Sequence, residues 1–420
     1  MKIRFYNARV LTMADDINIE NGELWVKDGL IDYVGSEKAD NTEFFDREID
    51  AKGNLLMPGF KNSHTHSAMT FLRSYADDLP LLEWLNNQVF PMEAKLKNED
   101  IEPLVKLAIM EYLTSGVTAC LDMYMFPLQM AETSVKCGFR TVLNAVVLEG
   151  VKKLEEDYNY FNNYDPLISF KLGFHAEYTS DKKTLQELGE LSNALKAPMY
   201  THNSEGRPEV YQCIERTGMT PTAYLDSFGI FNYGGGCFHC VHLTNDDMEI
   251  FKEKGISVVT NPGSNTKLAS GIAPLTTIQE KGINIALGTD GPASNNCLDM
   301  FREMFLATGL QKLKLDDASA MSASNVLKMA TVNGAKVMQL DNCDVLAKGK
   351  CADLIMIDLN QPNMQPINNI AKNIVYSGSK QNVKLTMVNG KILYEDGKFN
   401  IGEEPESVYE KANRIINSMR

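Results

Sequence analysis

Residues 57–69 read MPGFKNSHTHSAM, and they place two histidines, His64 and His66, at the end of an apolar segment. The whole chain of 420 residues contains only six histidines. A short apolar run such as the one before His64 is typical of a buried strand. Residues two apart on a strand point to the same side. His64 and His66 are therefore predicted to face the same side of a strand end.

The surrounding sequence repeats this pattern of a short apolar run that ends in polar residues. Amphipathic stretches such as 98–116 and 181–197 separate the apolar runs, as expected for helices. Eight βα units in succession predict a (β/α)8 barrel of the TIM type. The eight predicted strands cover residues 54–64, 116–124, 140–147, 167–179, 197–205, 235–244, 256–265 and 283–296.

The two ends of the chain have a different pattern of short strand-like runs, including residues 373–378 (NIVYSG). Asn389-Gly390, between TMV and KILY, is a strong signal for a two-residue hairpin turn. We expect α/β architecture in three parts: a small β-sandwich domain from residues 1–56 and 345–402, a barrel over 57–344, and an amphipathic helix over 403–420.

Composition narrows the class of protein. The net charge of −14 argues against a nucleic-acid polymer as partner, because such proteins need a basic face. The N-terminus does not resemble a signal peptide, and no apolar run is long enough to span a membrane. Eight scattered cysteines do not form a disulfide framework. We expect a cytoplasmic protein with free thiols and a small-molecule substrate; a homo-oligomer is compatible with the sequence.

Polar side chains follow most of the predicted barrel strands. In a TIM barrel the carboxyl ends of the strands meet at one face, where the chemistry is located. His64, His66, His202 and Asp290 are predicted to converge there and to bind one metal ion. Three imidazoles and one carboxylate leave room for a water molecule, as in catalytic rather than structural zinc sites, and the metal would lower the pKa of that water.

Other polar residues in these segments have two interpretations. Glu205, three residues after His202, is either a solvated carboxylate or a proton shuttle at the mouth of the metal site. Trp84 is interpreted as a core residue and Glu93 as a solvated helix residue. The Gly-, Ser- and Asn-rich loops GSNTKLASG and GPASNN form turns or donate hydrogen bonds to a ligand.

Two further motifs are interpreted as structural. The sequence CFHC contains Cys237 and Cys240, which have opposite parity on a strand, and no second cysteine pair stands at zinc-ribbon spacing. These cysteines are predicted to be small buried residues. His242 lies beyond the end of its strand and is predicted to be a structural residue.

The motifs together resemble those of a known superfamily. PGFKNSHTHSAMTFLRSYADDLPLLEWL, THNSE, FHCVHLT, NPGSNTKLASGIAPL and GTDGPASNN are similar to segments of amidohydrolase-superfamily deaminases. The resemblance is strongest to 5-methylthioadenosine/S-adenosylhomocysteine deaminases, and it extends over nearly the whole chain. It implies a metal-dependent hydrolase of non-peptide C–N bonds that releases ammonia from an aminopurine nucleoside.

The resemblance also implies residue roles. It implies one divalent metal ion per subunit, most often Zn²⁺, although Fe²⁺ and other ions occupy related sites. The implied metal ligands are His64, His66, His202 and Asp290; the implied catalytic residues are Glu205 as general acid/base, His239 and Asp290; and the implied substrate contacts are Trp84, Glu93, His175, Glu205 and Ser294.

One position departs from the pattern. Many members that accept S-adenosylhomocysteine have an arginine near the end of the third strand, where this chain has Asn144 and Ala145. We therefore expect a preference for 5′-methylthioadenosine or adenosine, unless Lys152 or Lys153 supplies the missing charge. The alternatives are a guanine deaminase, a triazine hydrolase, a cyclic-amide hydrolase, and a barrel that binds a ligand without converting it. Cyclic-amide hydrolases usually bridge two metal ions with a carboxylated lysine on the fourth strand, and the lysine available here, Lys171, lies about 13 Å upstream of His175, too deep for that role.

Overall fold

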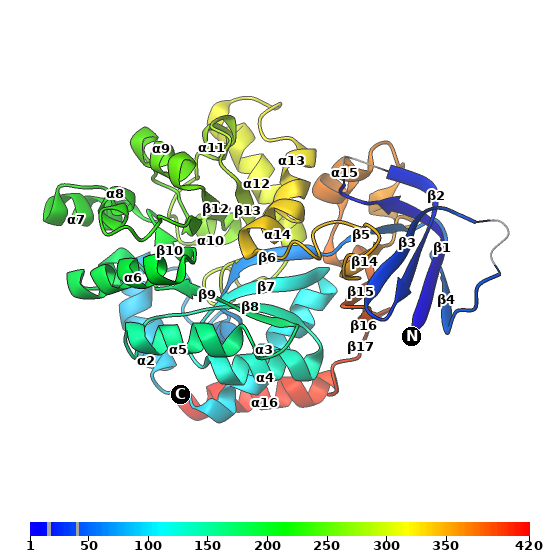
Figure 1. Ribbon diagram of the computed structural model, residues 1–420, viewed down its shortest axis with the longest axis horizontal. Helices are drawn as coiled ribbons and strands as arrows, with labels where there is room; N and C mark the ends of the chain where they lie inside the picture. Colours follow the sequence, from blue (N-terminus) through cyan, green and yellow to red (C-terminus); the bar gives the residue numbers. More distant parts are fainter. Residues whose placement is uncertain (15–17, 39–41) are drawn as a thin grey trace.

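The computed structural model describes residues 1–14, 18–38 and 42–420. Eight parallel strands follow one another around a barrel in chain order, with helices outside them (Figure 1). The predicted barrel is therefore confirmed. Its strands are β6 (Phe60–Thr65), β7 (Val117–Met123), β8 (Arg140–Asn144), β9 (Ile168–Gly173), β10 (Met199–Asn203), β11 (Gly235–His239), β12 (Ile256–Thr260) and β13 (Ile285–Leu287).

The barrel strands are buried on both faces, as parallel strands covered by helices usually are. Polar contacts join β13 to β6 where the first and last strands meet. The N–H of Asp290 donates to the carbonyl of His64 (3.0 Å), and the N–H of Thr289 donates to Oδ1 of Asn62 (2.9 Å). This seam brings Asp290, from the end of the barrel, beside the histidine pair from its beginning.

Helices follow the strands and cover the outside of the barrel. The larger ones are α3 (Asn98–Thr114), α4 (Pro127–Cys137), α5 (Val151–Phe161), α6 (Lys182–Leu195), α7 (Arg207–Thr217), α8 (Pro221–Asp226), α9 (Asn245–Lys254), α10 (Pro262–Lys267), α11 (Leu275–Glu280), α12 (Met300–Leu315), α13 (Ala323–Met329) and α14 (Val332–Met338). The segment after β6 forms short turns of helix: η1 (Ser67–Leu72), α1 (Leu81–Trp84), η2 (Leu85–Val89) and α2 (Phe90–Glu93). Single-turn elements elsewhere are η3 (Glu177–Thr179), η4 (Pro362–Met364) and η6 (Lys380–Asn382).

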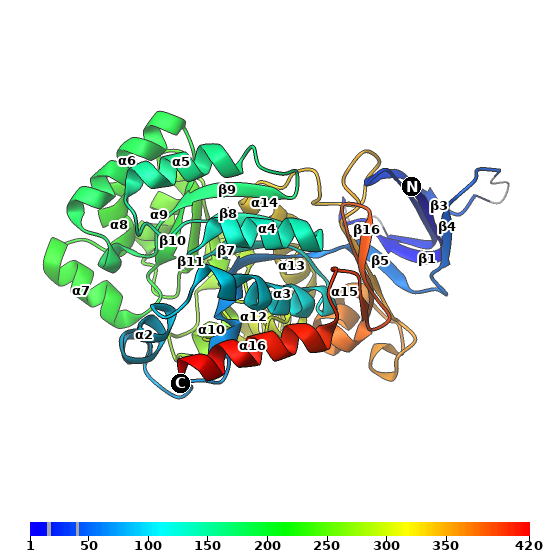
Figure 2. The ribbon, with the colours of Figure 1, turned by 90° about the horizontal axis from the view of Figure 1, so that it is seen from below.

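Strands from both chain ends form a second sheet beside the barrel (Figures 1 and 2). Its order is β17-β16-β15-β14-β5-β1-β2-β3, and β4 pairs with β1. Apolar side chains from both halves of this sheet form one buried cluster. The strands are β1 (Lys2–Leu11), β2 (Asn18–Lys27), β3 (Leu30–Ser36), β4 (Arg47–Asp50), β5 (Leu55–Pro58), β14 (Leu354–Ile357), β15 (Val383–Val388), β16 (Lys391–Glu395) and β17 (Lys398–Phe399).

The first predicted strand, residues 54–64, is divided between the two sheets. β5 pairs with β14 and β1 in the second sheet, whereas β6 pairs with β7 in the barrel. Gly59 lies at the division, and a Cβ atom at this position would come within 2.1 Å of the side chain of Thr118. The strand predicted over residues 54–64 is therefore two strands, and a glycine, which has no Cβ, allows the chain to pass close to Thr118 between them.

The C-terminal part contains one further correction. Residues 373–378 are not a strand: α15 (Ile370–Lys372) continues into η5 (Asn373–Ser377), which buries Ile374 and Val375 near α12 and α13. Tertiary packing therefore overrides the strand propensity of this segment. A C-terminal helix is present as α16 (Pro405–Met419), which packs along α3 with Val408, Ala412 and Ile415 buried (Figure 2).

The state of the thiols and the character of the helices complete the description of the fold. The eight cysteines, all within the described ranges, are unpaired. Of the helices in these ranges, none has the length and apolar character needed to cross a membrane.

Candidate active site

Five metal-capable side chains meet at the carboxyl ends of the barrel strands. His64 comes from β6, His202 from β10 and His239 from β11, while His66 and Asp290 lie just beyond β6 and β13. Two overlapping sets, His64 with His202 and His239, and His64 with His66 and Asp290, each place their ligand atoms within 4.8 Å of one another. The structure thus brings the predicted ligands together, and His239 lies within the same group.

Hydrogen bonds orient three of these imidazoles. Nδ1 of His66 contacts the carbonyl of Met123, and Nδ1 of His202 contacts the carbonyl of His175 (2.7 Å). Carbonyl oxygens only accept, so Nδ1 carries the hydrogen and Nε2 presents a lone pair. Nδ1 of His239 contacts Oδ1 of Asn265 (2.7 Å) in the same way. Each ring therefore offers its Nε2 as a ligand atom.

His64 provides the test of whether a metal fits. Its side chain is fully buried, and neither ring nitrogen has a hydrogen-bond partner in the part of the chain that the structure describes. Its ring stacks on Phe238 with the centroids 3.8 Å apart. Burial lowers its pKa well below the usual value, so the ring is neutral. Unpartnered nitrogens on a buried neutral imidazole suit a metal ligand.

Asp290 supplies the negative charge of the group. Its Oδ1 lies 3.3 Å from Nε2 of His66 and 3.6 Å from Nε2 of His64. Burial lowers the pKa of His66, but the hydrogen bond and charge of Asp290, together with the carbonyl of Met123, raise it overall to about 9. The Asp290 carboxylate therefore favours a positive charge beside it, which is either a proton on Nε2 of His66 or a cation bound there in place of that proton.

Three donors hold the Asp290 carboxylate in place. Ser264 Oγ (2.6 Å) and Ser294 Oγ (2.8 Å) both donate to Oδ2, and the N–H of Gly291 donates to Oδ1 (2.7 Å). The hydroxyl of Ser294, predicted to contact substrate, thus bonds Asp290. Ser264 was not singled out from the sequence, although it lies in the loop GSNTKLASG that was expected to donate hydrogen bonds.

Glu205 lies beside the cluster but outside both ligand sets. Its Oε2 is 3.7 Å from Nε2 of His239, and its Oε1 accepts a hydrogen bond from Ser270 (3.4 Å). Burial raises the pKa of Glu205, which favours proton exchange near neutral pH. Glu209, missed by sequence reasoning, holds the loop by accepting from the N–H groups of Ser204 (2.9 Å) and Glu205 (2.8 Å).

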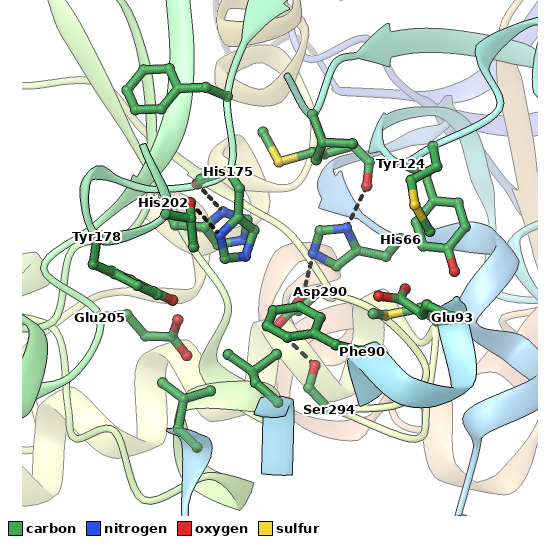
Figure 3. Close-up of a pocket in the computed structure, with 18 of the residues that line it drawn as sticks. His66, Phe90, Glu93, Tyr124, His175, Tyr178, His202, Glu205, Asp290 and Ser294 are labelled. Atoms are coloured by element: carbon green, nitrogen blue, oxygen red, sulfur yellow. Dashed lines mark hydrogen bonds and ion pairs between the residues drawn. The ribbon is translucent and has the colours of Figure 1, made fainter. Parts of the chain in front are cut away.

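A cavity of about 240 Å³ opens over this cluster. The predicted substrate contacts Trp84, Glu93, His175, Glu205 and Ser294 all line it, as Figure 3 shows for the last four. The sequence alone did not single out Tyr124 and Tyr178, which also line it. The other walls are mostly apolar: Met69, Leu81, Leu85, Phe90, Met123, Met125, Val146, Val147, Leu148, Phe174 and Leu268.

Several residues considered from the sequence lie outside the cavity lining. His242 contacts the carbonyl of Ser270 through Nε2 (2.8 Å), in agreement with a structural role. Lys171 donates to Gln339 (2.5 Å), and Asn144 donates to backbone carbonyls of β9. The predicted structural role of Cys237 and Cys240 agrees with their complete burial.

Lys152 and Lys153, after the third barrel strand, also lie outside the cavity lining. The side chain of Lys152 is 90% exposed. Lys153 forms an ion pair with Asp157 on the same helix and lines a neighbouring depression that also contains Glu149. Neither lysine therefore lines the cavity above the histidines.

Comparisons with known proteins agree with this architecture. Residues 55–393 match the model of the amidohydrolase family. The chain is 36% identical to a 5-methylthioadenosine/S-adenosylhomocysteine deaminase of Caldanaerobacter subterraneus subsp. tengcongensis, with 100% of this chain and 99% of that protein covered. It is 38% identical to a 5′-deoxyadenosine deaminase of Methanococcoides burtonii, with 93% and 92% covered.

Solved structures of other proteins also resemble this chain. A zinc-bound adenosine deaminase from Xanthomonas campestris superposes with a TM-score of 0.94 and 31% identity, over 100% of this chain and 98% of that one. A triazine hydrolase from Arthrobacter aurescens, at 19% identity and a TM-score of 0.89, over 99% of each chain, shows the shared fold. This chain is a member of the amidohydrolase family.

Proposed function

We propose that this protein is a metal-dependent deaminase that replaces the amino group of an aminopurine nucleoside with oxygen and releases ammonia. The observation that carries the proposal is the position of Glu205, beside the histidine and aspartate cluster at the base of an apolar cavity. The names of the relatives from C. subterraneus and M. burtonii support the same class of substrate.

The metal is proposed to be Zn²⁺, held by His64, His66, His202 and Asp290. The zinc bound to the X. campestris adenosine deaminase supports this choice. A metal at this position supplies Lewis acidity that makes water a nucleophile near neutral pH. Asp290 would supply the carboxylate of this set, and the hydrogen bonds from Ser264, Ser294 and the N–H of Gly291 hold that carboxylate in place.

Protein side chains move the protons of the reaction. Glu205 accepts a proton from the attacking water and delivers it to a ring nitrogen, which makes the amino-bearing carbon electrophilic. His239, whose Nε2 lies 3.7 Å from Glu205 and 3.8 Å from Asp290, orients the water through its lone pair. The oxygen bonds to the ring carbon, and a second proton transfer to the amino group breaks the C–N bond and releases ammonia.

The cavity walls favour a nucleoside with a small uncharged 5′ group, such as 5′-methylthioadenosine, 5′-deoxyadenosine or adenosine. Among its described lining residues there is no lysine or arginine. The carboxylate of S-adenosylhomocysteine would thus lack a cationic partner. Lys153 cannot readily supply one, because Asp157 already pairs with it and Glu149 lines the same depression.

The test is ammonia release measured as kcat/KM on one preparation. We expect 5′-methylthioadenosine, 5′-deoxyadenosine and adenosine to be deaminated, and S-adenosylhomocysteine to be converted about 10-fold less efficiently or worse, as the loss of one charge-assisted hydrogen bond implies. Lys153→Ala should leave this ratio unchanged. A preference for S-adenosylhomocysteine would overturn the substrate proposal. Activity only on guanine, a chlorotriazine or a cyclic amide would overturn the reaction class.

A further inference from the structure

Lys267 is a charged side chain whose hydrogen bonds join three loops beside the cavity. It is the last residue of α10, within the loop GSNTKLASG, and it lies outside the described lining of the cavity. Its ammonium group donates to Oδ1 of Asp77, to Oδ1 of Asn296 and to the carbonyl of Ala293 (3.1 Å). An ammonium group has three hydrogens, so all of its donors are used within the protein.

Two of the acceptors of Lys267 also bond to each other. Nδ2 of Asn296 donates to Oδ2 of Asp77 (3.0 Å) and to Oγ of Ser74 (3.0 Å). Burial raises the pKa of Asp77, but the hydrogen bonds from Lys267 and Asn296 outweigh it and lower the pKa overall, so the carboxylate stays ionised. Lys267, Asp77 and Asn296 therefore form a closed polar cluster in which each side chain bonds the other two.

The backbone around this polar cluster adopts conformations that need support. Ser74 (φ 56°), Asp78 (φ 65°) and Asn296 (φ 68°) are all in the left-handed region. Residues with side chains rarely stay in this region unless neighbouring contacts hold them there. The polar cluster includes Asn296, bonds Ser74 and contains the residue before Asp78, so it holds the turn at residues 74–78.

This turn leads directly into one wall of the cavity. The wall segment, residues 79–93, contains α1, η2 and α2, and Figure 3 labels two of its side chains. Its lining residues are Leu81, Trp84, Leu85, Phe90 and Glu93. On the other side of the polar cluster, Leu268 follows Lys267 and Ser294 follows Ala293, and both line the same cavity. The polar cluster therefore lies where three lining segments meet, and it sets the spacing between them.

We propose that Lys267 and Asp77 are positioning residues that hold the wall segment at the distance from the loops after β12 and β13 at which a nucleoside binds. They act through the lining side chains of these segments and do not touch the substrate. Without the polar cluster, the wall segment occupies its binding position for only a fraction of the time. The apparent affinity for substrate falls by that fraction, while the chemistry of the bound complex is unchanged. The effect on substrate rests on the proposed function, whereas the order of the wall segment does not.

Acrylamide quenching of tryptophan fluorescence tests the order of the wall segment without any substrate. The chain has two tryptophans: Trp84 lies in the wall segment and is 6% exposed, whereas Trp25 lies in β2. In a Trp25→Phe background, Lys267→Met should raise the quenching constant of Trp84 at least about 2-fold, because a wall segment that opens locally exposes the ring. Lys281→Met, which breaks a surface ion pair with Glu249, is the matched control and should leave the quenching constant unchanged.

Steady-state kinetics of Lys267→Met, Asp77→Ala and the double variant test the effect on substrate. With 5′-methylthioadenosine we expect KM to rise about 10-fold in each single variant, with kcat and metal content equal to those of wild type. Both substitutions break the same polar cluster, so the double variant should have nearly the KM of either single variant rather than the product of the two increases. If Lys267→Met does not fold, Asp77→Ala gives the same readings from the other side of the polar cluster.

The outcomes separate this inference from the proposed function. Unchanged quenching of Trp84, multiplied increases of KM in the double variant, or a lower kcat at unchanged KM would overturn the role of Lys267 and Asp77 while the deaminase proposal stands. If wild type releases ammonia from no nucleoside, the proposed function fails. Raised quenching of Trp84 in Lys267→Met would then still show that the polar cluster holds the wall segment.

Discussion

Asp290 and His239 of this site have backbone conformations that residues with side chains rarely adopt. Its backbone is in the left-handed region (φ 60°), which is uncommon for a residue with a side chain, and His239 shares this feature (φ 69°). Hydrogen bonds from Ser264, Ser294 and Gly291 fix the carboxylate. Such strained residues with fully bonded side chains are typical of functional sites.

Replacing Asp290 by Ala should abolish metal binding and turnover. The variant loses the single carboxylate of the proposed ligand set, so metal affinity should fall by more than the roughly 10–100-fold typical of changes outside the ligands. Metal content per chain after dialysis measures this, and Zn²⁺ should raise the melting temperature of wild type only. Ser294→Ala, which removes one hydrogen bond to Asp290, should retain the metal. A full equivalent of metal in Asp290→Ala would contradict the assignment.

Replacing Glu205 by Gln should leave metal content unchanged and reduce kcat by at least about 100-fold, because glutamine has nearly the same shape but cannot transfer a proton. Burial already raises the pKa of this carboxyl in the protein. Steady-state assays with metal analysis on the same sample give both readings. Glu215→Gln, on the exposed face of α7, serves as the control. Unaltered turnover in Glu205→Gln would assign the proton transfer to another group.

At the scale of elements, the hairpin between β15 and β16 joins the two chain ends. Asn389 (φ 49°) and Gly390 (φ 74°) form its tight turn, as the sequence predicted. A Cβ atom on Gly390 would lie 2.6 Å from Cα of Gly29, in the turn between β2 and β3. Two turns more than 350 residues apart in the chain therefore touch backbone to backbone.

Gly390→Ala should destabilise the protein by more than Gly397→Ala. Both glycines have a positive φ, 74° and 84°, so both substitutions carry the strain of about 1 kcal/mol that an L-residue meets there. Only Gly390 has a close neighbour, since nothing lies within 4 Å of a Cβ at Gly397. Urea unfolding of the two variants gives the difference. Equal losses would show that the contact with Gly29 relaxes without cost.

At the scale of the whole molecule, a buried ion pair joins the barrel to the second sheet. Arg140, at the start of β8, donates to Asp353, just before β14, with distances of 2.7 and 3.1 Å. Asp353 also accepts from the N–H of Asn389 (2.7 Å). Burial alone would raise the pKa of Asp353, but Arg140, Lys61 and this N–H outweigh it and hold the pKa below its usual value.

Arg140→Met should lower the unfolding free energy by about 3–5 kcal/mol at neutral pH, because it leaves a buried carboxylate without its partner. A carboxyl whose folded pKa is lowered contributes stability above its unfolded pKa, and that contribution is lost as the pH falls through the folded pKa. The difference between wild type and variant should therefore shrink below about pH 4. Denaturant unfolding at pH 7 and at low pH measures both the loss of stability and its dependence on pH.

Lys136→Met, which breaks an exposed ion pair with Glu102, is the control and should change stability by less than about 1 kcal/mol. A pH-independent difference for Arg140→Met would show that packing, not charge, is lost.

Local patterns in the sequence predicted the barrel and its histidines for a simple reason. Strand periodicity and the alternation with helices act over a few residues, so they can be recognised without knowing the fold. The common direction of parallel strands then places His64, His202 and Asp290 at one face. The same reasoning failed for NIVYSG and for the division at Gly59, where distant packing decides the conformation.

The sequence by itself determined the fold class, the residues that meet at the candidate metal site and the position of Glu205 beside it. Only the tertiary structure decided which groups hold and complete that site: Ser264 against Asp290, Asn265 against His239, and Tyr124 beside Glu93. Each of these contacts joins segments 26 or more residues apart across different βα units. Their distances depend on how the strands tilt and the loops pack, and no local period in the chain records that geometry.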